Sequence, residues 1–95
     1  MKSETDLRND VQRAQRADQL LNDPMIQEFI IAMRGKLLNE FESTGLDDDK
    51  ERSNAWQKSQ ILNSFLEEFT KAIKKGKDAR SKLEQAKHTL LRNII

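Results

Sequence analysis

Cysteine is absent from this 95-residue chain, which also has one proline and only three glycines. Without cysteine there is no disulfide framework and no thiolate chemistry. A β-rich fold needs many tight turns, which depend on glycine and proline, so this composition argues against strands. Long apolar runs are missing too, since the longest, Phe29 to Met33, is far too short to span a bilayer. These absences predict an all-α protein with no membrane partner.

Charged residues make up 35% of the chain and apolar residues 36%. This balance is too polar for a compact core of ordinary size and is typical of long amphipathic helices that bury one stripe. The length allows one domain at most, so we expect a single helical domain over residues 1–95. The N-terminus, MKSETDLRND, lacks the apolar segment of a secretory signal, so we expect the chain to stay in the compartment where it is synthesised.

Apolar residues recur at helical spacing in three segments. The predicted helices cover about residues 3–21, 24–43 and 49–94. Ser3 and Asp6 are suited to cap the first helix. Asp23 is a good N-cap and Pro24 is favoured at the first helical position, so one helix should stop and the next restart there, with a kink. Gly45 can adopt the left-handed conformation that ends the second helix before the chain reverses.

The third helix carries two rows of apolar or small residues at seven-residue intervals, as in the seam of a coiled coil. The rows contain Ala55, Leu62, Phe69, Gly76, Leu83 and Leu90, and Phe65, Ala72, Ala79 and Ala86. We therefore predict a long antiparallel helical hairpin, kinked at Asp23-Pro24 and coiled-coil-like along its length. The predicted pairs are residues 24–43 with 50–73 and residues 3–21 with 76–94.

Small residues should allow close packing in the second of these pairs. Gly76, Ala79 and Ala86 lie on the third helix, and they would face Ala14 and Ala17 of the first. That half of the hairpin can pack closely but buries little apolar surface.

The second helix is the most apolar of the three, and we expect it to be buried on more than one side. A hairpin of two layers leaves part of it and of its neighbour uncovered. The side chains predicted to be uncovered are Phe29, Ile31, Leu38, Trp56 and Phe65. Oligomerisation or docking on a larger partner would cover them. Trp56 has two interpretations, because tryptophan on an amphipathic helix often belongs to the core but is also over-represented among interface hot spots.

Positive charge is concentrated at the C-terminal end. Residues 1–69 hold nine Lys and Arg against fourteen Asp and Glu, a net charge of −5, whereas residues 70–95 hold eight against two, a net charge of +6. Such asymmetry suggests an interaction end. The basic cluster that would contact DNA phosphates or an acidic partner comprises Lys71, Lys74, Lys75, Lys77, Arg80 and Lys82. A solvated helix face explains the same cluster, because it lacks the interleaved aromatic residues of single-strand binders.

No residue pattern points to catalysis, a cofactor or a metal. His88 is the only histidine and has no second His or Cys at ligand spacing. The acidic run Asp47–Asp49 lacks the alternating ligands and distal Glu of an EF-hand and suits the start of the third helix instead. Gly76-Lys77 lacks the upstream glycine and the following Ser or Thr of a phosphate-binding loop. We therefore expect neither an enzyme nor a small-molecule substrate.

Four stretches give the chain a resemblance to a known group of proteins. They are RAQRADQLLNDPMIQEFI, DDDKER, AWQKSQILNSFLEEF and KKGKDA. Through them, residues 14–77 resemble small helical proteins encoded in the structural and morphogenesis gene clusters of tailed bacteriophages and prophages. The chain departs from that group in its longer basic tail, residues 78–95. The resemblance implies a virion-assembly or virion-associated protein, located in the host cytoplasm or in the virion.

Three functional hypotheses stand at this point. The first is a non-enzymatic structural or assembly factor of a tailed phage, which acts through helical protein–protein contacts as a homo-oligomer or on a larger phage structural protein. The second is a nucleic-acid-binding accessory protein of DNA packaging, with the basic cluster on phosphates. The third is a phage inhibitor that docks on a host protein. The residues themselves do not separate the three.

Overall fold

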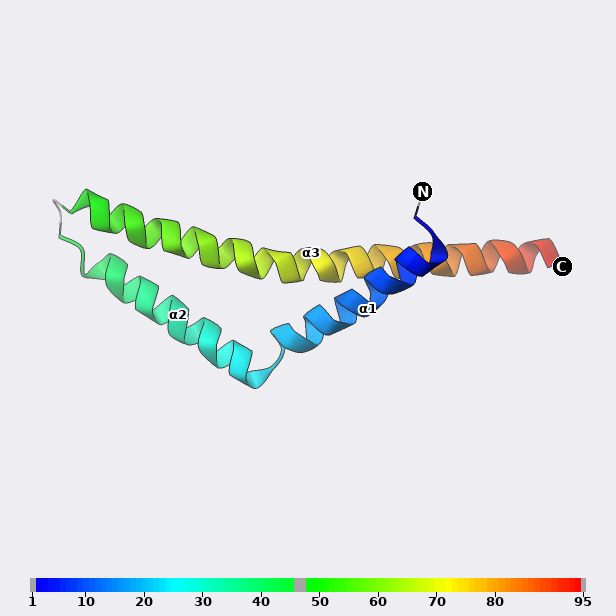
Figure 1. Cartoon of the computed structure of the whole chain (residues 1–95), viewed down its shortest axis with the longest axis horizontal. Helices are drawn as coiled ribbons and strands as arrows, with labels where there is room; N and C mark the ends of the chain where they lie inside the picture. Colours follow the sequence, from blue (N-terminus) through cyan, green and yellow to red (C-terminus); the bar gives the residue numbers. More distant parts are fainter. Residues whose placement is uncertain (1, 46–47, 95) are drawn as a thin grey trace. The chain divides into compact units, whose positions relative to one another are not determined.

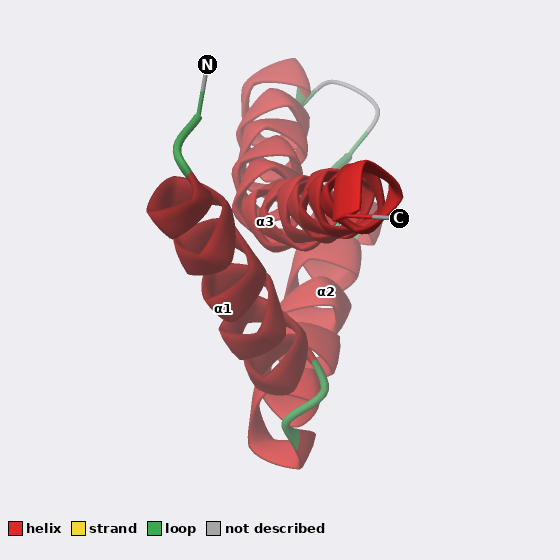
Figure 2. Ribbon diagram, turned by 90° about the vertical axis from the view of Figure 1, so that its right-hand side faces the viewer, coloured by secondary structure: helices red, strands yellow, loops and turns green. Residues whose placement is uncertain are grey.

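The structure of the chain is a computed structural model that describes residues 2–45 and 48–94 (Figure 1). The chain forms three helices, α1 (Glu4–Leu21), α2 (Pro24–Glu42) and α3 (Asp49–Ile94). Helices account for 91% of the described residues, and no strand occurs among them (Figure 2). The predicted all-α class is therefore confirmed, and each helix bound lies within one residue of the predicted one.

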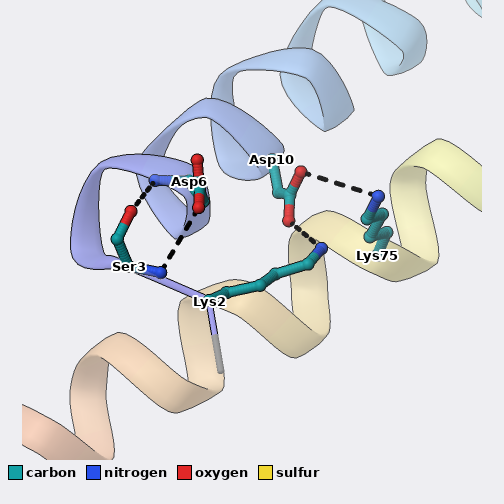
Figure 3. Close-up of polar contacts among 5 residues, drawn as sticks. All are labelled: Lys2, Ser3, Asp6, Asp10 and Lys75. Atoms are coloured by element: carbon teal, nitrogen blue, oxygen red, sulfur yellow. Dashed lines mark hydrogen bonds and ion pairs between the residues drawn. The ribbon is translucent and has the colours of Figure 1, made fainter.

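Ser3 and Asp6 cap the start of α1 (Figure 3). The Ser3 hydroxyl oxygen accepts a hydrogen bond from the backbone N–H of Asp6 at 3.1 Å, and the Asp6 carboxylate accepts one from the N–H of Ser3 at 3.4 Å. This reciprocal pair is a capping box, which satisfies two backbone donors that have no partner inside the helix. The predicted cap is confirmed.

The break between α1 and α2 arises from Asp23 and Pro24. Asp23 is the N-cap of α2, with φ −65° and ψ 129°, and its carboxylate accepts hydrogen bonds from the N–H groups of Met25 at 2.8 Å and Ile26 at 3.2 Å. Pro24 occupies the first helical position, where a missing N–H leaves no helical hydrogen bond unmade. The predicted stop and restart is confirmed.

The end of α2 differs from the prediction at Gly45. The C-cap is Ser43, with φ −81° and ψ −7°, and no glycine in the described residues has a positive φ, so the predicted left-handed Gly45 is wrong. Side chains provide the alternative, because the hydroxyls of Ser43 and Thr44 donate to the last carbonyls of the helix, those of Glu40 at 3.0 Å and Phe41 at 2.7 Å. Leu46 and Asp47 of the predicted reversal lie outside the described residues.

The chain divides into two compact units, and α3 contributes to both. Unit 1 joins α1 up to Leu20 with α3 from Phe69 onward, and unit 2 consists of residues 21–68, which include α2 and the first part of α3. These groups combine the same segments that the sequence paired. The single domain over residues 1–95 stays a prediction.

In unit 1, α1 and α3 approach closely at Gly76. A Cβ atom on Gly76 would lie 2.1 Å from the Cβ of Ala14 and 3.0 Å from the carbonyl oxygen of Asp10. Because carbon atoms pack at about 3.5–4.0 Å from one another, only glycine fits at this point. The predicted facing of Gly76 and Ala14 is confirmed.

The rest of unit 1 buries little apolar surface. Among its described residues, the buried apolar side chains are Ala17 and Ala79, which are 7% and 2% exposed. Ala86, predicted to face Ala14 or Ala17, is exposed and lines a shallow groove with Leu7. The prediction for Ala86 is wrong because ten residues of helix separate it from Gly76, about 15 Å, which brings it opposite the first turns of α1.

In unit 2, α2 packs against the first part of α3. Ala55 and Leu62 of α3 are 2% and 7% exposed, but α2 has no buried residue at all. The Glu40 carboxylate forms an ion pair with Lys58 Nζ at 3.1 Å across the two helices. The expectation that α2 is buried on more than one side is therefore wrong for the chain by itself, since α3 covers only one face of α2.

Candidate interaction surface

Large apolar side chains are exposed mainly in unit 2. Nine of the eleven in the described residues belong to it, and their exposed fractions run from 45% to 69%. They are Met25, Phe29, Ile31, Met33, Leu38, Phe41, Trp56, Ile61 and Phe65. Scattered apolar residues are normal on a protein surface, but this number within 48 residues of one unit forms a concentration that marks interaction sites.

Groove A is an apolar groove in unit 2, with a volume of about 680 Å³. Eight apolar residues and three charged residues line it. They are Ile26, Phe29, Ile30, Met33 and Leu37 of α2, Ile61, Leu62 and Phe65 of α3, and the charged Lys36, Glu40 and Lys58. Glu40 and Lys58, which carry opposite charges, form an ion pair at 3.1 Å in this groove. The groove is thus an apolar surface with charges of both signs.

Groove B, also in unit 2, is smaller than groove A, with a volume of about 380 Å³. Its residues are Arg34, Leu37, Leu38 and Phe41 of α2 and Trp56, Ser59, Leu62 and Asn63 of α3. Leu37 and Leu62 line both grooves, so they mark the seam between α2 and α3, and the grooves flank that seam. The described residues of unit 2 therefore form two apolar grooves that share only Leu37 and Leu62.

Helical spacing explains why the apolar residues divide in this way. Residues four apart lie on the same side of a helix, as Phe29 and Met33 do on α2 and Ile61 and Phe65 do on α3. Leu38 projects from a different side of α2 and reaches groove B. A wide apolar stripe that meets a single partner helix leaves both of its flanks uncovered.

The predicted interface residues are all exposed, but they do not form one surface. Phe29 and Phe65 line groove A, Leu38 and Trp56 line groove B, and Ile31 lines neither although it is 68% exposed. Trp56 is 58% exposed, so its interpretation as a core residue is wrong for the single chain. Their role as an interface stays a prediction.

Sequence reasoning missed Ile61 as a surface residue. Ile61 is 69% exposed and lies in groove A, but it belongs to neither seven-residue row of α3. The available signal was its four-residue spacing to Phe65, which places both on one flank beside the buried Leu62.

The basic cluster lies on α3 within unit 1, and all six of its side chains are exposed. Lys75 of this cluster lies near an acid, with its Nζ 3.9 Å from the Asp10 carboxylate of α1 (Figure 3). Lys2 Nζ donates to the other oxygen of that carboxylate at 2.6 Å. The hydrogen bond from Lys2 holds the pKa of Asp10 below its ordinary value, and the same bond raises the pKa of Lys2. These contacts join the N-terminal segment, α1 and α3.

Within residues 2–45 and 48–94, no three His, Cys, Asp or Glu side chains are grouped closely enough to hold a metal ion. His88 is exposed, and Asp47 of the acidic run lies outside these ranges. None of the helices described above combines the length and apolarity needed to cross a membrane.

Comparisons of the chain with models of protein families, with curated proteins and with solved structures find no match.

Proposed function

We propose that this chain is a non-enzymatic interaction protein, a virion-assembly or virion-associated factor of a tailed phage, which acts by docking unit 2 on other proteins. The observation that carries the proposal is the exposure of nine large apolar side chains in unit 2. The link to phage assembly comes from the resemblance of residues 14–77.

The size of the exposed apolar surface favours a binding role. With about 200 Å² of surface per large side chain, fractions of 45–69% leave on the order of 1,000 Å² exposed in unit 2. The largest apolar patch on a typical monomer is about 300–600 Å² and is often functional. The total is divided between groove A, groove B and residues outside both, so each groove corresponds to a patch of the size that is often functional, and a partner that covers it explains the exposure.

We further propose that the chain is an antiparallel hairpin with coiled-coil-like packing. Two contacts in unit 2 support this arrangement: Phe41 of α2 lies by Arg52 of α3, and Glu40, one residue earlier, pairs with Lys58, six residues later. In unit 1, Asp10 lies by Lys75, and Leu7 lines a groove with residues from 80 to 91. In both units, residues earlier in α1 or α2 contact residues later in α3, as expected for antiparallel helices.

The proposed function is tested in the phage or lysogen that encodes the chain. We expect mass spectrometry to find the chain in purified particles, or, for an assembly factor, its deletion to lower the yield of particles. Phe29→Ser combined with Trp56→Ala changes both grooves and should reproduce the loss, whereas the exposed charge variant Glu67→Gln should not. Absence from particles together with an unchanged yield after deletion would contradict the proposal.

Nucleic-acid binding is the second candidate, favoured by six exposed cations within residues 71–82. Neutralising about five phosphates gives a slope of about −4 to −5 when the logarithm of affinity for duplex DNA is plotted against that of salt concentration. Replacing Lys74 and Lys77 by glutamine should reduce the slope by about 2, since each phosphate contact contributes about 0.9. Lys75 should contribute less than these two, because Asp10 already lies 3.9 Å from its ammonium group. Binding that does not change with salt leaves the cluster as a solvated face.

A further inference from the structure

We propose that two copies of this chain associate through groove A, so that α2 and the first part of α3 from each copy form half of a four-helix bundle. The inference rests on the proposed function, because it names the partner of one of the two grooves. Four-helix bundles bury the apolar faces of two helix pairs against each other in this way.

The apolar area of groove A matches what a dimer needs. Phe29, Met33, Ile61 and Phe65 are 53%, 49%, 69% and 57% exposed. At about 200 Å² per large side chain, these fractions leave on the order of 450 Å² of apolar surface on the four side chains in and around this groove. A standard interface buries about 800 Å² per partner, of which about 55–65% is apolar, or about 450–500 Å². Groove A and the exposed apolar side chains at its edges therefore supply the apolar part of one such interface.

The charges of groove A suit a second copy of the same surface. Lys36, Lys58 and Glu40 bring both signs into the groove, and Glu40 and Lys58 already form a 3.1 Å pair. A surface of one sign would call for a partner of the opposite sign, whereas a two-fold contact needs a surface that is complementary to itself. No residue of the basic cluster lines groove A, so its like charges do not oppose this contact.

Groove B is a poorer surface for self-association. Its volume is about 380 Å³ against about 680 Å³ for groove A, and its one charged residue is Arg34. Two copies of groove B would bring two arginines together without an acidic residue of the groove to separate them. Groove B is thus left for a different partner of the dimer.

The test compares two isoleucines with nearly equal exposure. Ile61 in groove A is 69% exposed and Ile31 outside both grooves is 68% exposed, so Ile61→Glu and Ile31→Glu make the same chemical change at matched sites. Sedimentation of the full chain should show a dimer at micromolar concentration. We expect Ile61→Glu to raise the dimer Kd by about 100-fold or more, because a buried charge without a partner is strongly unfavourable. Ile31→Glu should change it by less than about threefold.

Two controls accompany this comparison. Circular dichroism should show equal helix content for both variants, and Met33→Glu, also in groove A, should act as Ile61→Glu does. The single tryptophan reports on groove B, so its emission should stay constant as the dimer forms. A wild-type chain that is monomeric throughout, equal effects of the two glutamates, or a blue shift of Trp56 with concentration would each overturn the proposal.

Failure of the dimer can be distinguished from failure of the proposed function. If the wild-type chain is a monomer and Ile61→Glu still removes it from phage particles, groove A binds another protein and only the dimer is refuted. If the dimer forms as expected but the chain neither enters particles nor affects their yield, the dimer stands and the assembly function fails.

Discussion

Substitution of Gly76 by alanine tests whether α1 and α3 pack as closely as the structure indicates. The added Cβ would lie 2.1 Å from the Cβ of Ala14 and 3.0 Å from the carbonyl oxygen of Asp10. Both atoms are held by the α1 backbone and cannot rotate away, so the two helices must separate by more than about 1 Å to restore a normal carbon–carbon distance.

The size of the effect follows from two opposing terms. Overpacking costs about 1–3 kcal/mol, and a contact this short with rigid neighbours belongs at the upper end. Alanine is better than glycine in a helix by about 1 kcal/mol, which offsets part of that cost. We expect Gly76→Ala to lower the free energy of unfolding by about 2 kcal/mol.

Gly35 provides the matched control. It also lies inside a helix, but a Cβ added there meets nothing within 4 Å. Gly35→Ala should therefore raise the free energy of unfolding by up to about 1 kcal/mol through helix propensity. The two alanine variants should then differ by about 3 kcal/mol, which separates their urea midpoints by about 1 M or more at the usual denaturant dependence.

Urea unfolding followed by circular dichroism measures both variants, at one protein concentration because association contributes to stability. A second substitution, Ala14→Gly, removes the Cβ that Gly76→Ala would strike. In the double variant the two changes should therefore be coupled favourably by about 1 kcal/mol or more. Equal midpoints for Gly76→Ala and Gly35→Ala would refute the close approach, because both would then report helix propensity only.

Two further predictions concern the ion pair between Lys2 and Asp10 and the N-cap of α2. Because Lys2 holds the pKa of Asp10 below its ordinary value, the ionised carboxylate stabilises the fold above the ordinary carboxyl pKa of about 3.9, and this contribution is lost as the pH falls through the lower folded-state value. The urea midpoint of Asp10→Asn should therefore lie below that of the wild type at neutral pH and approach it in acid; a difference that does not change with pH would contradict the reasoning. Asp23→Ala should lower the free energy of unfolding by about 1 kcal/mol through loss of the cap on Met25 and Ile26, while Asp23→Asn should retain most of it, and equal losses in both would show that the cap contributes nothing.

The starts of the helices were predictable because caps are local. The side chains of Ser3, Asp6 and Asp23 accept hydrogen bonds from backbone N–H groups within three residues of themselves, so these caps do not depend on distant parts of the chain. The prediction for Gly45 was wrong because other local groups, not glycine, satisfy the end of α2. Glycine permits a left-handed conformation without requiring it, and nearby hydroxyls had already satisfied the carbonyls that such a conformation would serve.

The interaction surface was predictable only in part. Counting apolar residues showed that one partner helix could not cover α2, and the five residues named from the sequence are exposed. The division into two grooves depends on how far α2 is rotated about its own axis against α3, and no local residue pattern determines that rotation. Ile61 was missed because it belongs to neither seven-residue row, whereas its buried neighbour Leu62 does.

The contact between Gly76 and Ala14 has a consequence for how this chain can diverge over evolutionary time. Position 76 accepts a side chain only if position 14 gives up its own, so the two should change together among distant descendants of a common ancestor. Gly35, which faces open space, is free to drift to any good helix former. Related proteins of low overall sequence identity could therefore be sought by a pattern of three parts. These are an alanine on a short helix, a glycine on a long helix that contacts it, and an apolar helix that begins with proline and lies between the two in the sequence.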